Sequence, residues 1–142
     1  MQEGVSYARL DMNATERFVK LRERLGVSSF GMNLILLEPG QRGRIHRHEK
    51  QEEVYVVLEG TLSLVVEGRE RDLGDGEVAR VAPAVRRQLV NRGPGRCAIL
   101  AIGGAGEHVG RDGTAFVSWQ AMHGAPPQEI PLPEDLPQNE RR

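Results

Sequence analysis

Residues 40–60 read GQRGRIHRHEKQEEVYVVLEG, and this stretch decides both the expected fold and the expected site. His46 and His48 are two residues apart, so on an extended strand both imidazoles project from the same face. Glu53 follows a charged segment that can turn the chain, and an apolar strand comes directly after it. Neutral imidazoles and a carboxylate together suit a divalent transition metal such as iron, manganese, nickel or zinc. The sequence therefore predicts His46, His48 and Glu53 as metal ligands.

Short apolar segments separated by turn-forming residues extend on both sides of this stretch, from residue 29 to residue 103. We expect strands at residues 30–37, 44–48, 53–58, 61–67, 69–73, 77–81, 86–91 and 96–102. Sequences such as Pro39-Gly40 and Gly74-Asp75-Gly76 mark the turns between them. Many short strands without intervening helices predict an antiparallel sandwich or barrel, because a parallel sheet would need crossover helices. The expected fold class is therefore all-β.

The segments that flank this core differ from it in pattern. Residues 1–28 contain the one expected helix, at about residues 13–25, where apolar residues recur at helical spacing. Asn13 is expected to cap this helix and Gly26 to end it. Residues 104–142 are rich in proline and charge, so we expect a C-terminal extension that is either disordered or extended along the barrel or a partner subunit.

Length and composition exclude several classes of protein. The 142 residues suffice for one domain with a tail rather than for two domains. The net charge of -1 gives no sign of a nucleic-acid surface, and the apolar runs are too short to span a membrane. Cys97 is the single cysteine, which excludes an internal disulfide and fits a reducing compartment. Since the N-terminus has no signal-peptide pattern, we expect a cytoplasmic protein with no nucleic-acid or membrane partner.

The run from Gly40 to Gly60 resembles the first motif of the cupin superfamily. That motif is a glycine, five residues, His-x-His, three or four residues, a glutamate, six residues and a glycine. Every position is matched here, with the four-residue option before Glu53. The resemblance implies a jelly-roll β-barrel, and it implies that His46, His48 and Glu53 hold a divalent ion.

The second cupin motif is degenerate. It is a glycine, five residues, Pro-x-Gly, two residues, a histidine, three residues and an asparagine. In one register Gly76 and Asn91 match, alanines replace the proline and the glycine, and Arg87 takes the place of the histidine. A competing register uses Pro83 as the proline and puts Gln88 at the histidine, but it needs one extra residue after Gly76 and one fewer before Asn91.

Arg87 leaves three interpretations open, because arginine offers no lone pair to a metal. A divalent ion and a guanidinium ~6 Å apart repel by roughly 5 kcal/mol at an effective dielectric near 20. In the first interpretation the three ligands bind a metal with open positions, and Arg87 acts in catalysis by orienting an anionic substrate or stabilising negative charge. In the second, no metal binds, and Arg87 captures a small anion with the histidines. In the third, Arg87 faces outward and Gln88 faces inward, since neighbours on a strand face opposite ways.

Other polar residues complete the expected site. Tyr55 shares the strand face of Glu53 and is expected to line the pocket, so Tyr55, Arg87 and Gln88 are the predicted substrate-binding residues. His108 and His123 lie in loop-like segments and are expected at the surface, with His108 a candidate substitute ligand.

Function is predicted at the level that the resemblance allows. We expect a small cupin that binds a divalent metal and acts on a small, anionic or enolisable molecule by dioxygenase-like or isomerase-like chemistry. The alternative is a non-catalytic ligand-binding or sensing cupin, metal-free or weakly metallated. Because residues 54–58 and 62–66 are apolar on both faces, a homodimer is expected to cover the second face.

Overall fold

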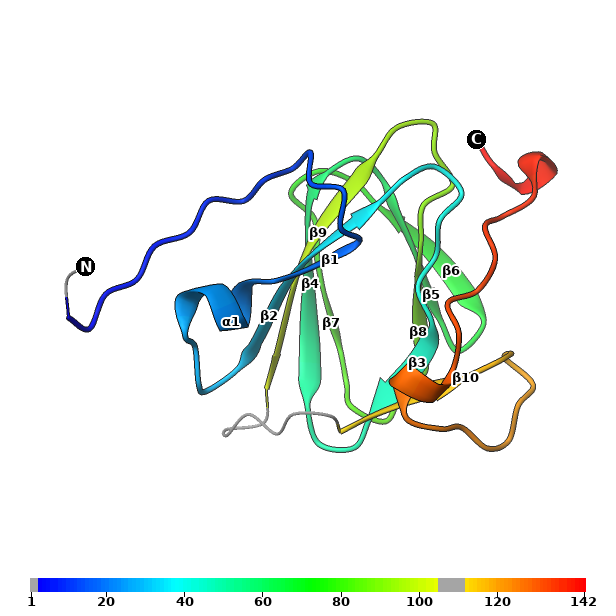
Figure 1. Ribbon diagram of the computed structural model, residues 1–142. Helices are drawn as coiled ribbons and strands as arrows, with labels where there is room; N and C mark the ends of the chain where they lie inside the picture. The colour runs from blue at the N-terminus through cyan, green and yellow to red at the C-terminus, as the bar shows by residue number, and fades with distance from the viewer. Residues whose placement is uncertain (1–2, 105–111) are drawn as a thin grey trace.

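Two five-stranded antiparallel sheets pack face to face in the computed structural model, which describes residues 3–104 and 112–142 (Figure 1). The first sheet has the order β1 (Phe18–Lys20), β2 (Gly31–Leu37), β9 (Cys97–Gly104), β4 (Glu52–Glu59) and β7 (Val78–Val81). The second has the order β10 (Gly113–Phe116), β3 (Ile45–His48), β8 (Arg87–Val90), β5 (Leu62–Val66) and β6 (Arg69–Leu73). The predicted all-β antiparallel fold is confirmed.

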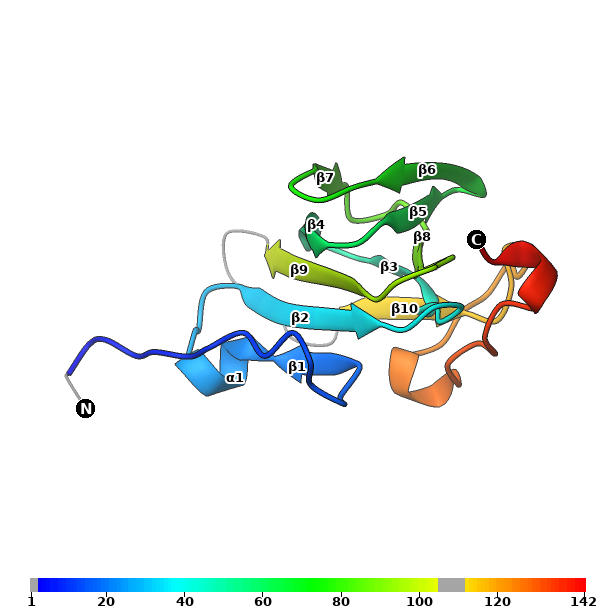
Figure 2. The same cartoon turned by 90° about the horizontal axis from the view of Figure 1, so that it is seen from above.

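The core lies between the two layers that Figure 2 shows from above. Alternation along the strands builds it: Tyr55 and Val57 of β4 are almost completely buried, whereas their neighbours Val54 and Val56 are only half-buried. Leucines and isoleucines of both sheets fill the remaining space. The sandwich therefore holds one apolar core, and any polar side chain that points between the sheets needs a partner there.

The predicted helix at residues 13–25 is wrong over most of its length. Residues Phe18–Lys20 form β1, which pairs with β2, and α1 contains only residues Leu21–Leu25. Val19 is buried where it pairs with Leu34, so this segment gains both strand hydrogen bonds and burial at the edge of the first sheet. A short isolated helix cannot match that gain, because helix nucleation is costly. Gly26 does end the helix, with a φ of 72°.

The C-terminal extension is extended along the second sheet, as one of the two sequence-based alternatives proposed. In its described residues, β10 pairs with β3, and the chain after β10 crosses the outer face of the sheet and forms two short 3-10 helices, η1 (Pro127–Glu129) and η2 (Gln138–Glu140) (Figure 1). Leu136 is buried against Val65 and Val90 and anchors the segment. No helix in the described part of the chain has the length and apolar character needed to cross a bilayer.

Candidate metal and ligand site

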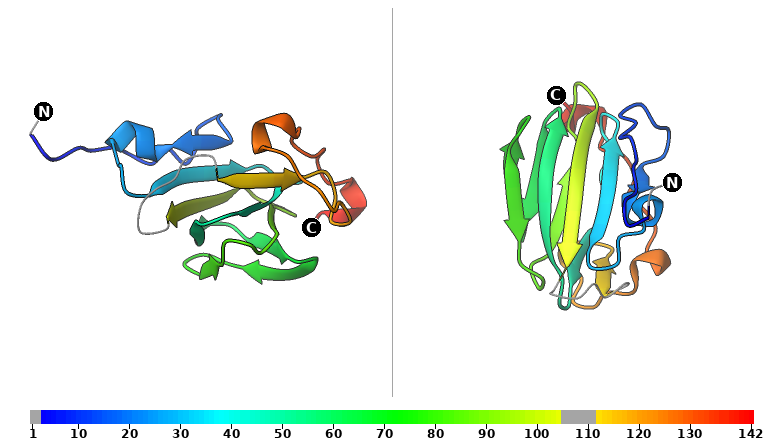
Figure 3. Two further views of the ribbon diagram at one scale, coloured as in Figure 1. Left: turned by 90° about the horizontal axis from the view of Figure 1, so that it is seen from below. Right: turned by 90° about the vertical axis from the view of Figure 1, so that its left-hand side faces the viewer.

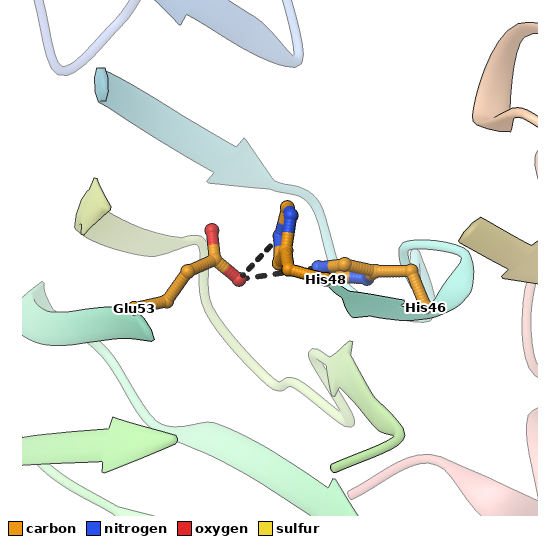
Figure 4. Close-up of side chains that lie close together, drawn as sticks. All are labelled: His46, His48 and Glu53. Carbon is orange, nitrogen blue, oxygen red and sulfur yellow. Dashed lines mark hydrogen bonds and ion pairs between the residues drawn. The ribbon is translucent and has the colours of Figure 1, made fainter. Parts of the chain in front are cut away.

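The two predicted histidines and the predicted glutamate meet between the sheets (Figure 4). His46 and His48 project from β3, and Glu53 projects toward them from β4 of the opposite sheet. The Nε2 atoms of the two histidines lie 3.3 and 3.2 Å from the same oxygen of Glu53, Oε1. One ligand atom from each residue falls within 4.8 Å of the other two, so the three side chains could hold one ion.

Outer hydrogen bonds fix which nitrogen of each ring faces Glu53. His46 Nδ1 lies 3.1 Å from the carbonyl oxygen of Arg44, and His48 Nδ1 lies 2.7 Å from Oδ1 of Asp112. In the tautomer with the proton on Nδ1, each ring presents its Nε2 lone pair to the cluster, which is the usual arrangement around metal-binding histidines.

His48 Nε2 is a buried nitrogen without an aligned hydrogen bond in the described residues. It lies within ion-pair distance of Glu53 Oε1, but the geometry does not suit a hydrogen bond. Lone pairs that face a carboxylate oxygen at this distance repel unless a cation lies between them. This unsatisfied nitrogen, together with the donor set, fits a divalent transition metal.

The charges of the cluster stabilise one another. Burial by itself would raise the pKa of Glu53, but the two histidines whose Nε2 atoms lie next to its Oε1 outweigh burial and hold that pKa well below its usual value. Burial would lower the pKa of His48, yet Glu53 and Asp112 together raise it. Burial likewise opposes ionisation of Asp112, but hydrogen bonds from two backbone N–H groups and from His48 lower its pKa. The site therefore favours a cation, either protons on the rings or a metal ion.

Arg87 points inward, toward Glu53 and away from solvent. Its side chain is completely buried, and its Nη2 and Nε lie 2.9 and 3.2 Å from Glu53 Oε1. Its Nη1 donates to three carbonyl oxygens of the loop before β8: Ala82, Pro83 and Val85. The interpretation with Arg87 outward and Gln88 inward therefore does not describe this structure. All three guanidinium nitrogens already have acceptors.

Tyr55 is the third group that supports Glu53. The Tyr55 hydroxyl donates to Glu53 Oε1 at 2.5 Å and accepts from Arg87 Nε at 3.3 Å. Burial, reinforced by the negative charge of Glu53, raises the pKa of Tyr55 well above its usual value. The phenol therefore stays protonated and acts as a hydrogen-bond donor.

A cavity of about 200 Å³, called the inner cavity below, opens beside this cluster. His46, His48, Glu53 and Tyr55 line it together with a mainly apolar wall. The remaining lining residues are Phe18, Asn33, Ile35, Leu37, Gly43, Arg44, Leu89, Ala101 and Pro127. A small, partly apolar molecule suits such a space.

Several predicted site residues lie elsewhere. Gln88 is buried on the opposite face of β8, where its amide nitrogen donates to the carbonyl oxygen of Gly43. It lines a second cavity of about 410 Å³, called the outer cavity below, between the second sheet and the C-terminal extension. His123 is exposed on that extension. The candidate substitute ligand His108 lies outside the described residues.

Sequence reasoning missed three contributors to the site. Asp112 directly precedes β10, and Phe18 belongs to β1. The sequence pattern predicted neither of these two short strands. Pro127 comes from η1 of the extension. An acidic residue followed by a short β-prone segment was the one available signal for Asp112, and it is weak.

Known proteins share this architecture. A family model described as a cupin domain matches residues 33–103, half of the chain. Among solved structures, a cupin protein from Bacteroides fragilis has 20% sequence identity and a TM-score of 0.65, over 76% of this chain and 90% of that chain. A search of curated proteins finds no significant match.

Two further similar structures carry functional descriptions. One is described as a sugar phosphate isomerase of the cupin superfamily from Silicibacter pomeroyi, with 29% identity and a TM-score of 0.63, over 82% of this chain and 79% of that chain. Another is described as a predicted oxalate decarboxylase from Thermotoga maritima, with 21% identity and a TM-score of 0.53, over 59% and 73% of the two chains. With the family model spanning the strands that carry both motifs, this chain belongs to the cupin domain family.

Proposed function

We propose that this cupin binds a divalent transition metal through His46, His48 and Glu53 and acts on a small anionic or enolisable molecule, with isomerase-like chemistry favoured over dioxygenase-like chemistry. The observation that carries the proposal is the convergence of two Nε2 lone pairs and a carboxylate, with His48 Nε2 buried and lacking an aligned hydrogen bond. Without a proton or a metal ion between them, an Nε2 lone pair and Glu53 Oε1 would repel each other.

Each residue of the cluster has a defined part in the proposed chemistry. A bound divalent ion would act as a Lewis acid for negative charge that develops on a substrate oxygen. Asp112 keeps the proton on His48 Nδ1 and so holds the ring in its ligating orientation. Arg87 and Tyr55 hold Glu53 in place and keep it ionised. The expectation that Arg87 itself contacts substrate stays a prediction, and its present bonds would have to change for that contact to form.

Isomerase-like chemistry gains support from the relative at 29% identity that is described as a sugar phosphate isomerase. An aldose–ketose interconversion passes through an enolised species, so negative charge on oxygen is what the site must stabilise. The two-histidine, one-carboxylate donor set also occurs in dioxygen-activating iron enzymes, which keeps the dioxygenase alternative in the proposal. Assays of phosphorylated sugars under anaerobic and aerobic conditions separate isomerase-like from dioxygenase-like chemistry, because only a dioxygenase needs dioxygen.

Metal analysis of protein purified without a nickel column tests the proposal directly. Stoichiometric metal is expected in the unaltered protein, and its loss is expected in a His46→Ala, His48→Ala double variant. His123→Ala removes an exposed histidine and is the matched control. Tight metal retained in the double variant would overturn the assignment of the ligands.

A second candidate function is metal-free binding of a small ligand. It is favoured by the hydrogen bonds that Glu53 Oε1 already accepts from Tyr55 and Arg87, which reduce its availability to an ion. This candidate predicts no stoichiometric metal in the purified protein, together with ligand-dependent thermal stabilisation that Arg87→Ala abolishes.

A cytoplasmic homodimer is the proposed state of the protein. Figure 3 shows the N-terminal segment beside β2, with the outer faces of β4 and β7 uncovered by it. Val78 is 58% exposed there, and Val54 and Val56 are half-buried, so a second copy would remove apolar surface from water. Sedimentation equilibrium should report a dimer, and Val56→Lys should dissociate it. A monomeric unaltered protein would refute this part of the proposal.

A further inference from the structure

The outer cavity is a second, half-open space that shares only Arg44 with the lining of the inner cavity. It lies between the outward face of the second sheet and the C-terminal extension, and its volume of about 410 Å³ is in the range of small-molecule sites. Ile45, Phe116 and Trp119 contribute apolar surface from one side, and Ile130 and Leu132 of the extension contribute it from the other.

Positive charge at this cavity is not neutralised within the described residues. Arg42 and Arg44 line the cavity, and the Nε of each donates to a backbone carbonyl of the extension, Glu134 at 2.9 Å and Ile130 at 2.6 Å. Within residues 3–104 and 112–142, neither arginine forms an ion pair, and no hydrogen bond uses an Nη atom of either. Glu134 also lines the cavity and offsets one of the two positive charges, which leaves a surplus of one.

Gln88 supplies a buried polar group at the same cavity. It is 5% exposed, and its amide nitrogen donates to Gly43 O at 2.9 Å. Among the residues that the structure describes, no hydrogen bond reaches its amide oxygen. Because this oxygen is not one of the buried polar atoms that lack a partner, solvent in the cavity reaches it, and a polar ligand could take the place of that solvent.

We propose that the outer cavity binds a small organic carboxylate, with its apolar body against Trp119 and Leu132 and its carboxylate on Arg42 and Arg44. A guanidinium with both Nη groups available matches a planar carboxylate. The mostly apolar wall strengthens that interaction, because the local dielectric beside it is lower than that of water. The corresponding carboxamide has the same shape but no charge, so it would make the apolar contacts and lose the attraction to the two guanidinium groups.

Trp119 makes this proposal testable separately from the metal site. It is the single tryptophan of the chain, and it lines the outer cavity but not the inner cavity. We expect cyclohexanecarboxylate to change the fluorescence of Trp119 saturably in the full chain, and to bind about tenfold tighter than cyclohexanecarboxamide. The His46→Ala, His48→Ala double variant should bind the probe unchanged, whatever its metal content.

Arginine variants test the assigned contacts. Arg42→Gln and Arg44→Gln should each weaken binding about tenfold, whereas Arg71→Gln, an exposed arginine of β6, should leave it unchanged. If Arg44→Gln alters Trp119 fluorescence without probe, because Arg44 Nε also holds the extension, Arg42→Gln carries the test. Equal binding of the acid and the amide, or full binding by Arg42→Gln, would overturn the proposal. So would a Trp119 spectrum that depends on protein concentration without probe, since a second copy would then occupy the cavity.

Discussion

The inner and outer cavities have only Arg44 in common, yet the metal site and the outer cavity use arginine in opposite ways. At the inner cavity, the buried Arg87 gives all three nitrogens to Glu53, Tyr55 and loop carbonyls. At the outer cavity, Arg42 and Arg44 give only Nε to the protein. The inner cavity therefore presents imidazoles and a carboxylate, which suit a cation, and the outer cavity presents free guanidinium groups, which suit an anion.

Removal of the inner guanidinium should have the largest effect. Arg87→Ala leaves Glu53 without its guanidinium partner and removes the side-chain donor to three loop carbonyl oxygens, of which Ala82 O and Pro83 O keep a backbone donor. The free energy of unfolding should therefore fall by about 3 kcal/mol. Urea unfolding near neutral pH measures this change. Arg71→Ala removes an exposed arginine and should change stability by less than about 0.5 kcal/mol. If Arg87→Ala lost no more than this control, Arg87 would not be the structural support that we infer.

The next largest effect concerns the outer support of His48. In Asp112→Asn the acceptor for His48 Nδ1 loses its charge, and metal affinity should fall about tenfold to a hundredfold. Competition with a chromogenic chelator measures the affinity. Asp75→Asn changes an exposed aspartate and provides the control. An unchanged affinity would show that Asp112 closes the loop through its bonds to Lys50 and Gln51 without orienting the ligand.

Replacement of Arg87 by the residue usual at that position of the motif should act in the opposite direction. Arg87→His removes a positive charge next to the site and adds a nitrogen ligand, so metal affinity should rise about tenfold. Calorimetric titration with zinc and manganese measures the gain. A matched Arg87→Gln variant removes the charge without adding an imidazole, so an equal gain in that variant would assign the effect to charge alone.

The sequence predicted the central strands β3 and β4 well and the short edge strands β1 and β10 poorly. The spacing of His46, His48 and Glu53 and the alternation along β3 and β4 were enough to predict the sandwich and to place the three side chains together, because a strand has a period of two. By contrast, β1 and β10 have three and four residues, and pairing with a neighbouring strand stabilises them more than any local pattern does. Asp112 and Phe18 were missed for that reason.

The role of Arg87 shows a second limit of sequence reasoning. Motif spacing placed Arg87 at the position of a ligand, and strand alternation allowed either Arg87 or Gln88 to face inward. The inward orientation of Arg87 is fixed by the loop before β8, where three carbonyl oxygens accept hydrogen bonds from its Nη1. Loop geometry of this kind depends on tertiary contacts that no local pattern encodes.

The smallest expected effect concerns the end of the C-terminal extension. The C-terminal extension is tied to β6 by an ion pair between Arg142 and Asp72, and the hydrogen bond from Arg142 lowers the pKa of Asp72 against a smaller opposing effect of burial. Because the folded-state pKa is lowered, this pair stabilises the protein above the pKa that Asp72 has in the unfolded chain. The contribution is lost as the pH falls through the folded-state pKa.

Asp72→Asn should therefore lower the free energy of unfolding by about 0.5 kcal/mol near neutral pH, since the pair is partly exposed and screened by solvent. The difference from the unaltered protein should disappear in acid, where Asp72 is protonated in both states, and it should shrink in high salt. Urea unfolding at neutral and acidic pH measures the first effect, and urea unfolding at low and high salt measures the second. Ser63 also donates to the Asp72 carboxylate, so Ser63→Ala is the control that separates this hydrogen bond from the ion pair. A difference that persisted in acid would mean that packing, rather than charge, holds the end of the extension against β6.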